Sequence, residues 1–309
     1  MVATIALRNI GKQYSAEWVL SNITMGVEKG SFQAIIGPPG SGKSTLLNII
    51  STLIQPETGT AYVHGLHLQV RYNQVRSLIG YLGQTEVLDY RMTLIENLQY
   101  AGLIYGLDDN FAKSRISELG VRFQIIEQLK KYPDKVSHGT RRIVEFIRTI
   151  LHNPSVILLD NPTQHMDSFN SEKVWSYLNE LRHDKTLIFI SKNLERIQSI
   201  ADRILILNEG QIATEGTLEQ MKQTFHLANV TELQLDKIED NDINELKGLS
   251  GIHNIDYNDD TFYLHLKSDE NPSKVLSLFD ASRVKKFIRR DIKLEDIYAH
   301  LIEESIIDD

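Results

Sequence analysis

The stretch "AIIGPPGSGKSTLLNIISTL", from Ala34 to Leu53, joins an apolar run, a turn rich in Gly and Pro, and a second apolar run. This order predicts a buried strand, a loop and a helix. Gly37, Gly42, Lys43 and Ser44 satisfy the pattern G-x-x-x-x-G-K-[ST], the Walker A motif of a P-loop. A chance Gly-rich turn would not be expected to meet all four positions between a strand and a helix. We therefore expect an α/β fold built round a phosphate-binding loop.

The residue types in this loop predict MgATP as the ligand. Glycines let the backbone fold closely round phosphates, and the positive end of the following helix attracts the same anion. Lys43 would reach the β- and γ-phosphates, and the Ser44 hydroxyl would ligate Mg²⁺. The predicted nucleotide-binding residues of the loop are Gly37, Pro38, Pro39, Gly40, Ser41, Gly42, Lys43, Ser44 and Thr45.

A second stretch, "SVILLD", ends in Asp160 and is followed by Asn161. Four apolar residues before an aspartate predict a buried strand that delivers a carboxylate to a metal. P-loop chemistry requires such a carboxylate beside the phosphate loop. An ordinary strand that ends in a turn aspartate would look the same in isolation, but in a chain that carries a P-loop the metal-binding interpretation is favoured.

Composition limits the classes of protein that remain. The chain has 309 residues, 41% of them hydrophobic, and no cysteine, so disulfides and thiolate metal sites are excluded. Apolar runs such as "TLIFI" are far shorter than the roughly 18 residues that span a bilayer. The N-terminal stretch lacks the basic-then-apolar order of a signal peptide. These features predict a cytoplasmic protein that reaches a membrane only through a partner.

Charge is unevenly distributed along the chain. Residues 225–309 hold 19 acids and 10 bases, a net charge of −9, whereas the whole chain carries −8 and residues 1–224 therefore carry +1. This shift predicts two domains, 1–224 and 225–309. The acidic tail argues against nucleic acid as a partner, because phosphate backbones attract basic surfaces.

Residues 1 to about 224 resemble the nucleotide-binding domain of an ABC transporter, and several motifs occur in the family's order. The resemblance implies a P-loop ABC-type domain with a helical subdomain. Tyr14, in "GKQYSAEWVL", lies where the family stacks an aromatic ring on adenine. Gln84, in "IGYLGQTEVL", lies at the Q-loop glutamine, which links Mg²⁺ and water to the transmembrane partner. The implied metal ligands are Ser44, Gln84 and Asp160.

The chain departs from the family at its signature motif. The family reads LSGGQ, and the aligned residues here are "VSHGT". Ser137 and Gly139 match the positions that bind the γ-phosphate of the other subunit across a head-to-tail dimer. His138 replaces a glycine and Thr140 replaces the glutamine. The signature residues implied to act in trans are Ser137, His138, Gly139 and Thr140.

Two further departures affect the chemistry of hydrolysis. Asn161 replaces the glutamate that acts as general base, and Lys192 replaces the switch histidine. An amide has essentially no basicity and can only hold water by hydrogen bonds. A lysine can contact phosphate only as a cationic donor. With Gln84, Asn161 and Lys192 at the catalytic positions, we expect nucleotide binding to be retained and hydrolysis by this chain alone to be weak.

The tail shows a different pattern. Alternating apolar residues in stretches such as "DTFYLHLK" and two helical stretches predict the order β-α-β-β-α-β-α, which is similar to a small ferredoxin-like α+β domain. Tails that end in a helix like "LEDIYAHL" resemble those of ABC-2-type exporter ATPases, including drug and peptide-antibiotic efflux systems.

Three functions are compatible with these features. The favoured one is the ATP-binding subunit of an ABC exporter, held at the inner face of the cell membrane by a separate transmembrane permease. Its second partner would be another ABC ATPase subunit, with a heterodimer favoured over a homodimer. The alternative is a nucleotide-sensing regulatory subunit that binds ATP without turnover. A soluble ABC ATPase of translation or DNA repair is disfavoured by the single copy of the domain and the acidic tail.

Overall fold

The computed structural model describes residues 3–225, 229–249, 251–266 and 273–307. The chain folds into two compact units, Met1–Glu215 and Gly216–Asp309. Helix α8 (Leu218–Thr224) belongs to the second unit because it packs against α11 (Leu294–Ile307). The boundary between the units therefore precedes the charge shift at Phe225, since packing rather than charge defines a compact unit.

The first unit contains a six-stranded sheet with the strand order β10-β9-β3-β8-β7-β6. The pairs that join β9, β3, β8, β7 and β6 are parallel. Every residue of β3, β7 and β8 is buried, which is typical of parallel strands covered on both faces. The strands are β3 (Phe32–Ile36), β6 (Ile79–Leu82), β7 (Val156–Asp160), β8 (Thr186–Ile190), β9 (Arg203–Asn208) and β10 (Gln211–Gly216).

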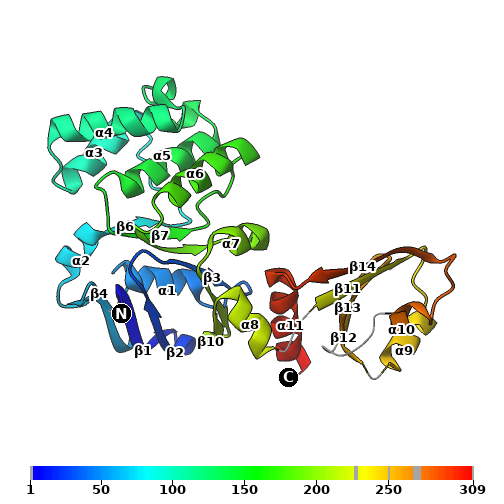
Figure 1. Ribbon diagram of the computed structural model, residues 1–309. Coiled ribbons are helices and arrows are strands. Elements are labelled where there is room, and N and C mark those ends of the chain that lie inside the picture. The colour runs from blue at the N-terminus through cyan, green and yellow to red at the C-terminus, as the bar shows by residue number, and fades with distance from the viewer. Residues whose placement is uncertain (1–2, 226–228, 250, 267–272, 308–309) are drawn as a thin grey trace. The chain divides into compact units, whose positions relative to one another are not determined.

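A second sheet in this unit has the order β2-β1-β4-β5, with β1 antiparallel to both β2 and β4. Helix α1 (Lys43–Ile50) lies between the two sheets and contacts both β2 and β7 (Figure 1). Apolar residues of α1 and of both sheets form one buried cluster, which fixes the helix that follows the P-loop. The strands are β1 (Ile5–Tyr14), β2 (Glu17–Val27), β4 (Thr58–Val63) and β5 (Leu66–His67).

Helices α3 (Leu94–Ile104), α4 (Asp109–Arg122) and α5 (His138–Ile150) pack together as a helical group (Figure 1). Thr93 and Asp108 cap the first two of these helices through their side-chain oxygens. The predicted P-loop α/β fold with a helical subdomain is thus confirmed. The remaining helices of the unit are α2 (Tyr72–Leu78), η1 (Ile126–Gln128), η2 (Pro133–Lys135), α6 (Ser168–Glu180) and α7 (Leu194–Ile200).

After α8, the second unit has the predicted β-α-β-β-α-β-α order. Its four strands form a sheet in the order β12-β13-β11-β14 with antiparallel pairs throughout, as in a ferredoxin-like split βαβ arrangement. Within the described ranges, neither unit has a helix long and apolar enough to cross a bilayer. The elements are β11 (Asn229–Leu235), α9 (Asp240–Lys247), β12 (Ile252–Asn258), β13 (Thr261–Leu266), α10 (Ser273–Leu276), β14 (Val284–Asp291) and α11.

Candidate nucleotide-binding site

Four neighbouring strands of the parallel sheet end at one edge, and each delivers a predicted site residue there. The P-loop follows β3, Lys192 follows β8, Asp160 ends β7 and Gln84 follows β6. Ligands of open α/β sheets bind outside the carboxyl ends of the strands. The sheet topology therefore brings together residues that lie far apart in the sequence.

The P-loop requires glycine at two of its positions. A side chain on Gly37, whose φ is +153°, would place Cβ 2.0 Å from the backbone oxygen of Leu207. A side chain on Gly42, whose φ is +94°, would place Cβ 2.7 Å from the backbone oxygen of Val19. The loop is thus wedged between β9 and β2, and only glycine fits without displacing a neighbouring backbone.

Lys43 lies at the centre of the loop. Its Nζ donates to the backbone oxygen of Pro38 at 2.6 Å, to that of Gly37 at 2.9 Å and to Ser41 Oγ at 3.0 Å. Burial lowers the pKa of Lys43, Asp160 opposes this shift, and the nearby positive charge of Lys192 adds to it. The loop therefore surrounds the ammonium group of Lys43, and Lys192 is close enough to affect its charge state.

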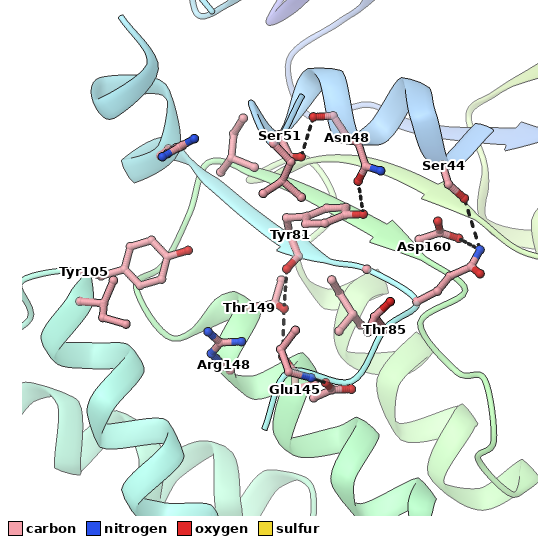
Figure 2. A pocket seen from close by; sticks show the side chains of 18 of the residues that line it. Ser44, Asn48, Ser51, Tyr81, Thr85, Tyr105, Glu145, Arg148, Thr149 and Asp160 are labelled. Carbon is pink, nitrogen blue, oxygen red and sulfur yellow. Dashed lines mark hydrogen bonds between the residues drawn. The ribbon is translucent and has the colours of Figure 1, made fainter. Parts of the chain in front are cut away.

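The predicted metal ligands form one hydrogen-bonded chain. Gln84 Nε2 donates to Asp160 Oδ1 at 2.9 Å and to Ser44 Oγ at 3.3 Å (Figure 2). No group of three or more His, Cys, Asp or Glu side chains is placed to hold a metal within the described part of the chain. A hydroxyl, a carboxylate and an amide carbonyl instead offer the hard oxygen atoms that Mg²⁺ prefers, so Ser44, Asp160 and Gln84 would be able to hold this ion.

Asn161 turns its side chain toward the same carboxylate. Its Nδ2 donates to Asp160 Oδ1 at 2.9 Å, and its backbone N–H donates to the oxygen of Ile190 at 3.0 Å. Its φ is +48°, a left-handed conformation that Asn tolerates better than most residues. Asn161, expected at the position of the family's general base, is thus a hydrogen-bond donor to the carboxylate of Asp160.

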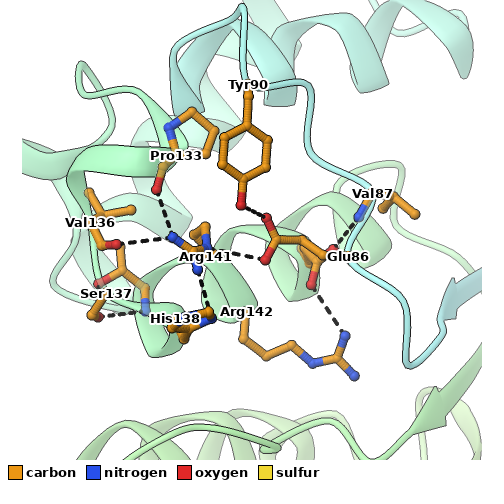
Figure 3. Close-up of polar contacts among 11 residues, drawn as sticks. Glu86, Val87, Tyr90, Pro133, Val136, Ser137, His138, Arg141 and Arg142 are labelled. Atoms are coloured by element: carbon orange, nitrogen blue, oxygen red, sulfur yellow. Dashed lines mark hydrogen bonds and ion pairs between the residues drawn. The ribbon is translucent and has the colours of Figure 1, made fainter.

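The signature residues lie at the N-terminus of α5. Ser137 caps the helix, and its Oγ accepts from the backbone N–H of Thr140 at 3.1 Å. Thr140 is 6% exposed, and its hydroxyl donates to Gln128 Oε1, so its side chain points inward. His138 is exposed, and its Nδ1 lies 2.6 Å from Arg141 Nη2 (Figure 3). Because a guanidinium only donates, Nδ1 accepts and the ring hydrogen lies on Nε2.

Known proteins match this chain over the first unit. A family model for the ABC transporter matches residues 20–164. The ABC transporter ATP-binding protein NatA of Bacillus subtilis is 31% identical over 70% of this chain and 89% of its own length. The daunorubicin resistance ATP-binding protein DrrA3 of Streptomyces coeruleorubidus is 31% identical over 68% of this chain and 67% of its own length. This chain belongs to the ABC transporter ATP-binding proteins.

Solved structures give the same result. The ATP-binding subunit of an ABC transporter superposes with a TM-score of 0.68 at 26% identity, and the match covers 72% of this chain and 93% of that one. A dimeric ATP-binding cassette in a post-hydrolysis state with ADP and Pi superposes with a TM-score of 0.65 at 27% identity, covering 69% and 98%. The share of this chain that is covered leaves room for the C-terminal unit.

Tyr14, the residue expected against adenine, lies at the end of β1 and pairs with Glu17 of β2. Its ring is 46% exposed, and Lys12 Nζ lies 5.2 Å from the ring centroid. Strand β2 carries Val19, whose backbone oxygen adjoins Gly42 of the P-loop. The ring therefore stands on a hairpin that packs against the ATP-binding loop.

Sequence reasoning missed two buried charges on α5. Arg142 is 6% exposed and Glu145 is 3% exposed, and the two form an ion pair at 3.2 Å. Burial raises the pKa of Glu145, and the hydrogen bond from the Val87 N–H together with Arg142 opposes the shift. Their spacing of three residues on a helix with an apolar face was the available indication, because such residues share one side of a helix.

A cavity of about 940 Å³ adjoins the Q-loop between α1, α2, β6, α3 and α5 (Figure 2). Ser44, Gln84 and Asp160 are among its lining residues, so the cavity adjoins the residues expected to hold Mg²⁺. Apolar residues such as Leu53, Val87 and Ile104 are more than half exposed at its border. Its charged lining residues are Arg76, Arg148, Glu145 and Asp160.

Proposed function

We propose that this chain is the ATP-binding subunit of an exporter-type ABC transporter, and that it binds MgATP firmly but hydrolyses it slowly when alone. The observation that carries the proposal is the arrangement of Lys43, Ser44, Gln84 and Asp160 at one sheet edge, with Asn161 donating to Asp160. The relatives NatA and DrrA3, the second named for daunorubicin resistance, support the exporter assignment.

The residues of this chain have distinct roles in the proposed site. The P-loop amides and Lys43 bind the phosphates, while Ser44, Gln84 and Asp160 hold Mg²⁺, which neutralises phosphate charge when bound. The Gln84 amide can present its oxygen to the cation by rotating, because amide orientation follows the hydrogen-bond partners. Asn161 orients water but accepts no proton, so no general base assists the attack of that water on ATP.

Calorimetry tests the binding part of this proposal. Lys43→Ala removes a cation at close range from the phosphates and should weaken MgATP binding by at least about tenfold. Lys113→Ala is a matched control, because Lys113 lies on α4 and pairs with exposed Asp109. Equal affinities of the wild-type chain and Lys43→Ala would contradict the proposed site.

ABC ATPase domains work with membrane permease subunits, and we propose that the permease docks in the cavity beside Gln84 at the inner face of the cell membrane. Ile104, which lines the cavity, is 59% exposed, so the chain leaves an apolar border uncovered. Arg76 and Arg148 favour a docking segment that carries a carboxylate. A short amphipathic helix of the permease with an acidic residue satisfies both features.

Copurification with the permease tests the docking site. Ile104→Asp should reduce recovery of the complex at least about tenfold, because it places a charge in the apolar contact. Leu103→Asp on the same helix is the control, since Leu103 is 71% exposed and does not line the cavity. Loss of the complex with both variants, or with neither, would contradict docking in this cavity.

The alternative is a nucleotide-sensing subunit that binds ATP without turnover, and the Asn161 contact with Asp160 favours it. The two functions differ in the partner. A polytopic membrane protein that copurifies with this chain supports the transporter subunit, whereas an exclusively soluble partner supports the sensor.

A further inference from the structure

Arg142 joins two segments of the candidate nucleotide site, the Q-loop and the end of β7. Its Nη1 donates to the backbone oxygen of Gly83 at 2.7 Å. Its Nη2 donates to the backbone oxygen of Asp160 at 2.8 Å and to that of Asn161 at 3.1 Å. Gly83 immediately precedes Gln84, so one guanidinium holds the backbone of Asp160 and that of the residue next to Gln84.

Glu145 completes this arrangement. Its Oε2 lies 3.2 Å from Arg142 Nη1, and its Oε1 accepts from the backbone N–H of Val87 at 2.7 Å. Gly83 and Val87 are the two ends of the segment that carries Gln84. Both ends are therefore fixed to the same turn of α5, and the Gln84 side chain extends from a segment that is held on each side.

Burying the Arg142 guanidinium costs desolvation free energy, and apolar packing alone does not offset that cost. A buried guanidinium loses its hydration, and a neighbouring carboxylate compensates only when the remaining donors are also satisfied. In the part of the chain that the structure describes, Arg142 Nε is buried without a hydrogen-bond partner. Buried polar groups without a partner are rare in native folds. The hydrogen bonds that Arg142 does make go to backbone oxygens of the candidate site and to Glu145.

We infer that Arg142, paired with Glu145, is a positioning residue that presets Gln84 and Asp160 for Mg²⁺. Mg²⁺ demands near-ideal octahedral geometry, so small displacements of these two ligands weaken its contribution. Arg142 itself touches neither nucleotide nor metal; it acts through the backbone of β7 and the Q-loop. The inference rests on the proposed function, because it assumes that the chain binds MgATP.

The neighbouring Arg141 provides a matched control. It is also buried on α5, at 8% exposure, and it also contacts the Q-loop segment, since its Nε donates to Glu86 Oε2 at 3.1 Å. Its other donors go to the backbone oxygens of Pro133 and Val136 and to His138, away from the metal ligands (Figure 3). Loss of Arg141 should therefore leave the geometry at Asp160 unchanged.

The experiment measures ATP affinity by calorimetry with Mg²⁺ and with EDTA, on the full chain. The ratio of the two affinities reports the contribution of the metal ligands separately from the P-loop. Arg142→Gln should lower the ratio by about tenfold or more, while Arg141→Gln should leave it within about twofold. Arg142→Lys keeps the charge beside Glu145 but cannot fork to both Gly83 and Asp160, so it should also lower the ratio. It serves as the milder variant if Arg142→Gln does not fold.

Three outcomes would overturn the inference. If the Arg142 variants melt at lower temperature but keep the wild-type ratio, Arg142 only stabilises the fold. If Arg141→Gln lowers the affinity ratio as much as the Arg142 variants do, any loss of a buried arginine from α5 has this effect, and Arg142 has no specific role. If the wild-type chain does not bind MgATP at all, the proposed function fails and the inference fails with it; binding with an unchanged ratio in the variants defeats the inference alone.

Discussion

Asn161 is the residue on which the proposed slow hydrolysis depends. We propose that it occupies the position of a general base; its side chain donates to Asp160 and has no basicity. Lys192, beside Lys43, adds a second cation where the family has a histidine. The proposed site thus has groups for phosphate and for Mg²⁺, while Asn161 offers no group to accept the proton of water.

Restoring the base should raise turnover. Asn161→Glu in the isolated chain should increase single-turnover ATP hydrolysis by about tenfold or more, below the 10²–10⁴-fold that general-base catalysis can supply, because Lys192 remains. Asn161→Glu combined with Lys192→His should exceed either single variant. Asn161→Gln is the control that lengthens the side chain without adding a base. Equal rates for the Glu and Gln variants would show that a missing base does not limit this site.

His138 offers a residue-scale test of the composite site proposed for an ABC dimer. Its Nδ1 is held by Arg141, so Nε2–H is the donor left for a phosphate of the other subunit. Glutamine places an N–H near the position of Nε2, whereas asparagine places a polar group only near that of Nδ1. In the assembled ATPase pair, His138→Gln should keep most of the turnover and His138→Asn should lose more. The opposite order would contradict a contact through Nε2.

At the scale of elements, the strands and the P-loop were predictable because their causes are local. Continuous apolar runs mark β3, β7 and β8, and the Walker A pattern marks the loop between β3 and α1. The tail's order of elements followed from short-range periodicity in the same way. Arg142 and Glu145 were not predictable as site residues, because their partners are backbone groups of Gly83, Val87 and Asp160, whose closeness depends on the tertiary fold.

The turn that follows α5 carries a pH-dependent contribution to stability. His152 stacks on Tyr105 with centroids 3.6 Å apart, and burial lowers its pKa to about 4. In the unfolded chain His152 has the ordinary pKa of about 6.5. Between that pH and about 4, the unfolded chain therefore binds a proton at His152 that the folded chain does not bind. This contribution is present above pH 6.5 and is lost as the pH falls through that value toward 4.

Urea unfolding at two pH values measures this effect. Between pH 7.5 and 4.5 the wild-type chain should lose about 2–3 kcal/mol more of its free energy of unfolding than His152→Gln. Glutamine does not titrate, and its amide N–H can still donate to the backbone oxygen of Ile79 as His152 Nε2 does. The carboxylates that protonate in this range are common to both proteins and cancel. The same loss in both proteins would contradict the assignment to His152.

At the scale of the whole molecule, ABC ATPase domains dimerise, and we propose that this chain pairs with a different ATPase subunit. Each site of a head-to-tail dimer combines the P-loop of one chain with the signature of the other. Self-pairing would place Asn161 and Lys192 in both sites and leave neither with a base. Ser137 and Gly139 of this chain would instead serve the active site of a partner that keeps its glutamate.

Turnover of the reconstituted pair tests this asymmetry. Ser137→Ala should lower steady-state hydrolysis by about tenfold or more, because it removes a donor to the γ-phosphate in the active site. Lys43→Ala should have the smaller effect, since it removes ATP from the slow site only. Turnover that is indifferent to Ser137 but collapses with Lys43→Ala would assign the active site to this chain's own P-loop.

The central claim, that this chain binds ATP firmly and hydrolyses it slowly when alone, is tested most directly by the identity of the nucleotide it retains. The isolated chain is loaded with labelled MgATP, separated from free nucleotide, incubated, quenched in acid and resolved into ATP and ADP. Asn161→Glu is treated in parallel. We predict that the wild-type chain returns mostly ATP while Asn161→Glu returns a larger share of ADP. Prompt and complete conversion to ADP by the wild-type chain, with Lys43→Ala showing none, would contradict the account.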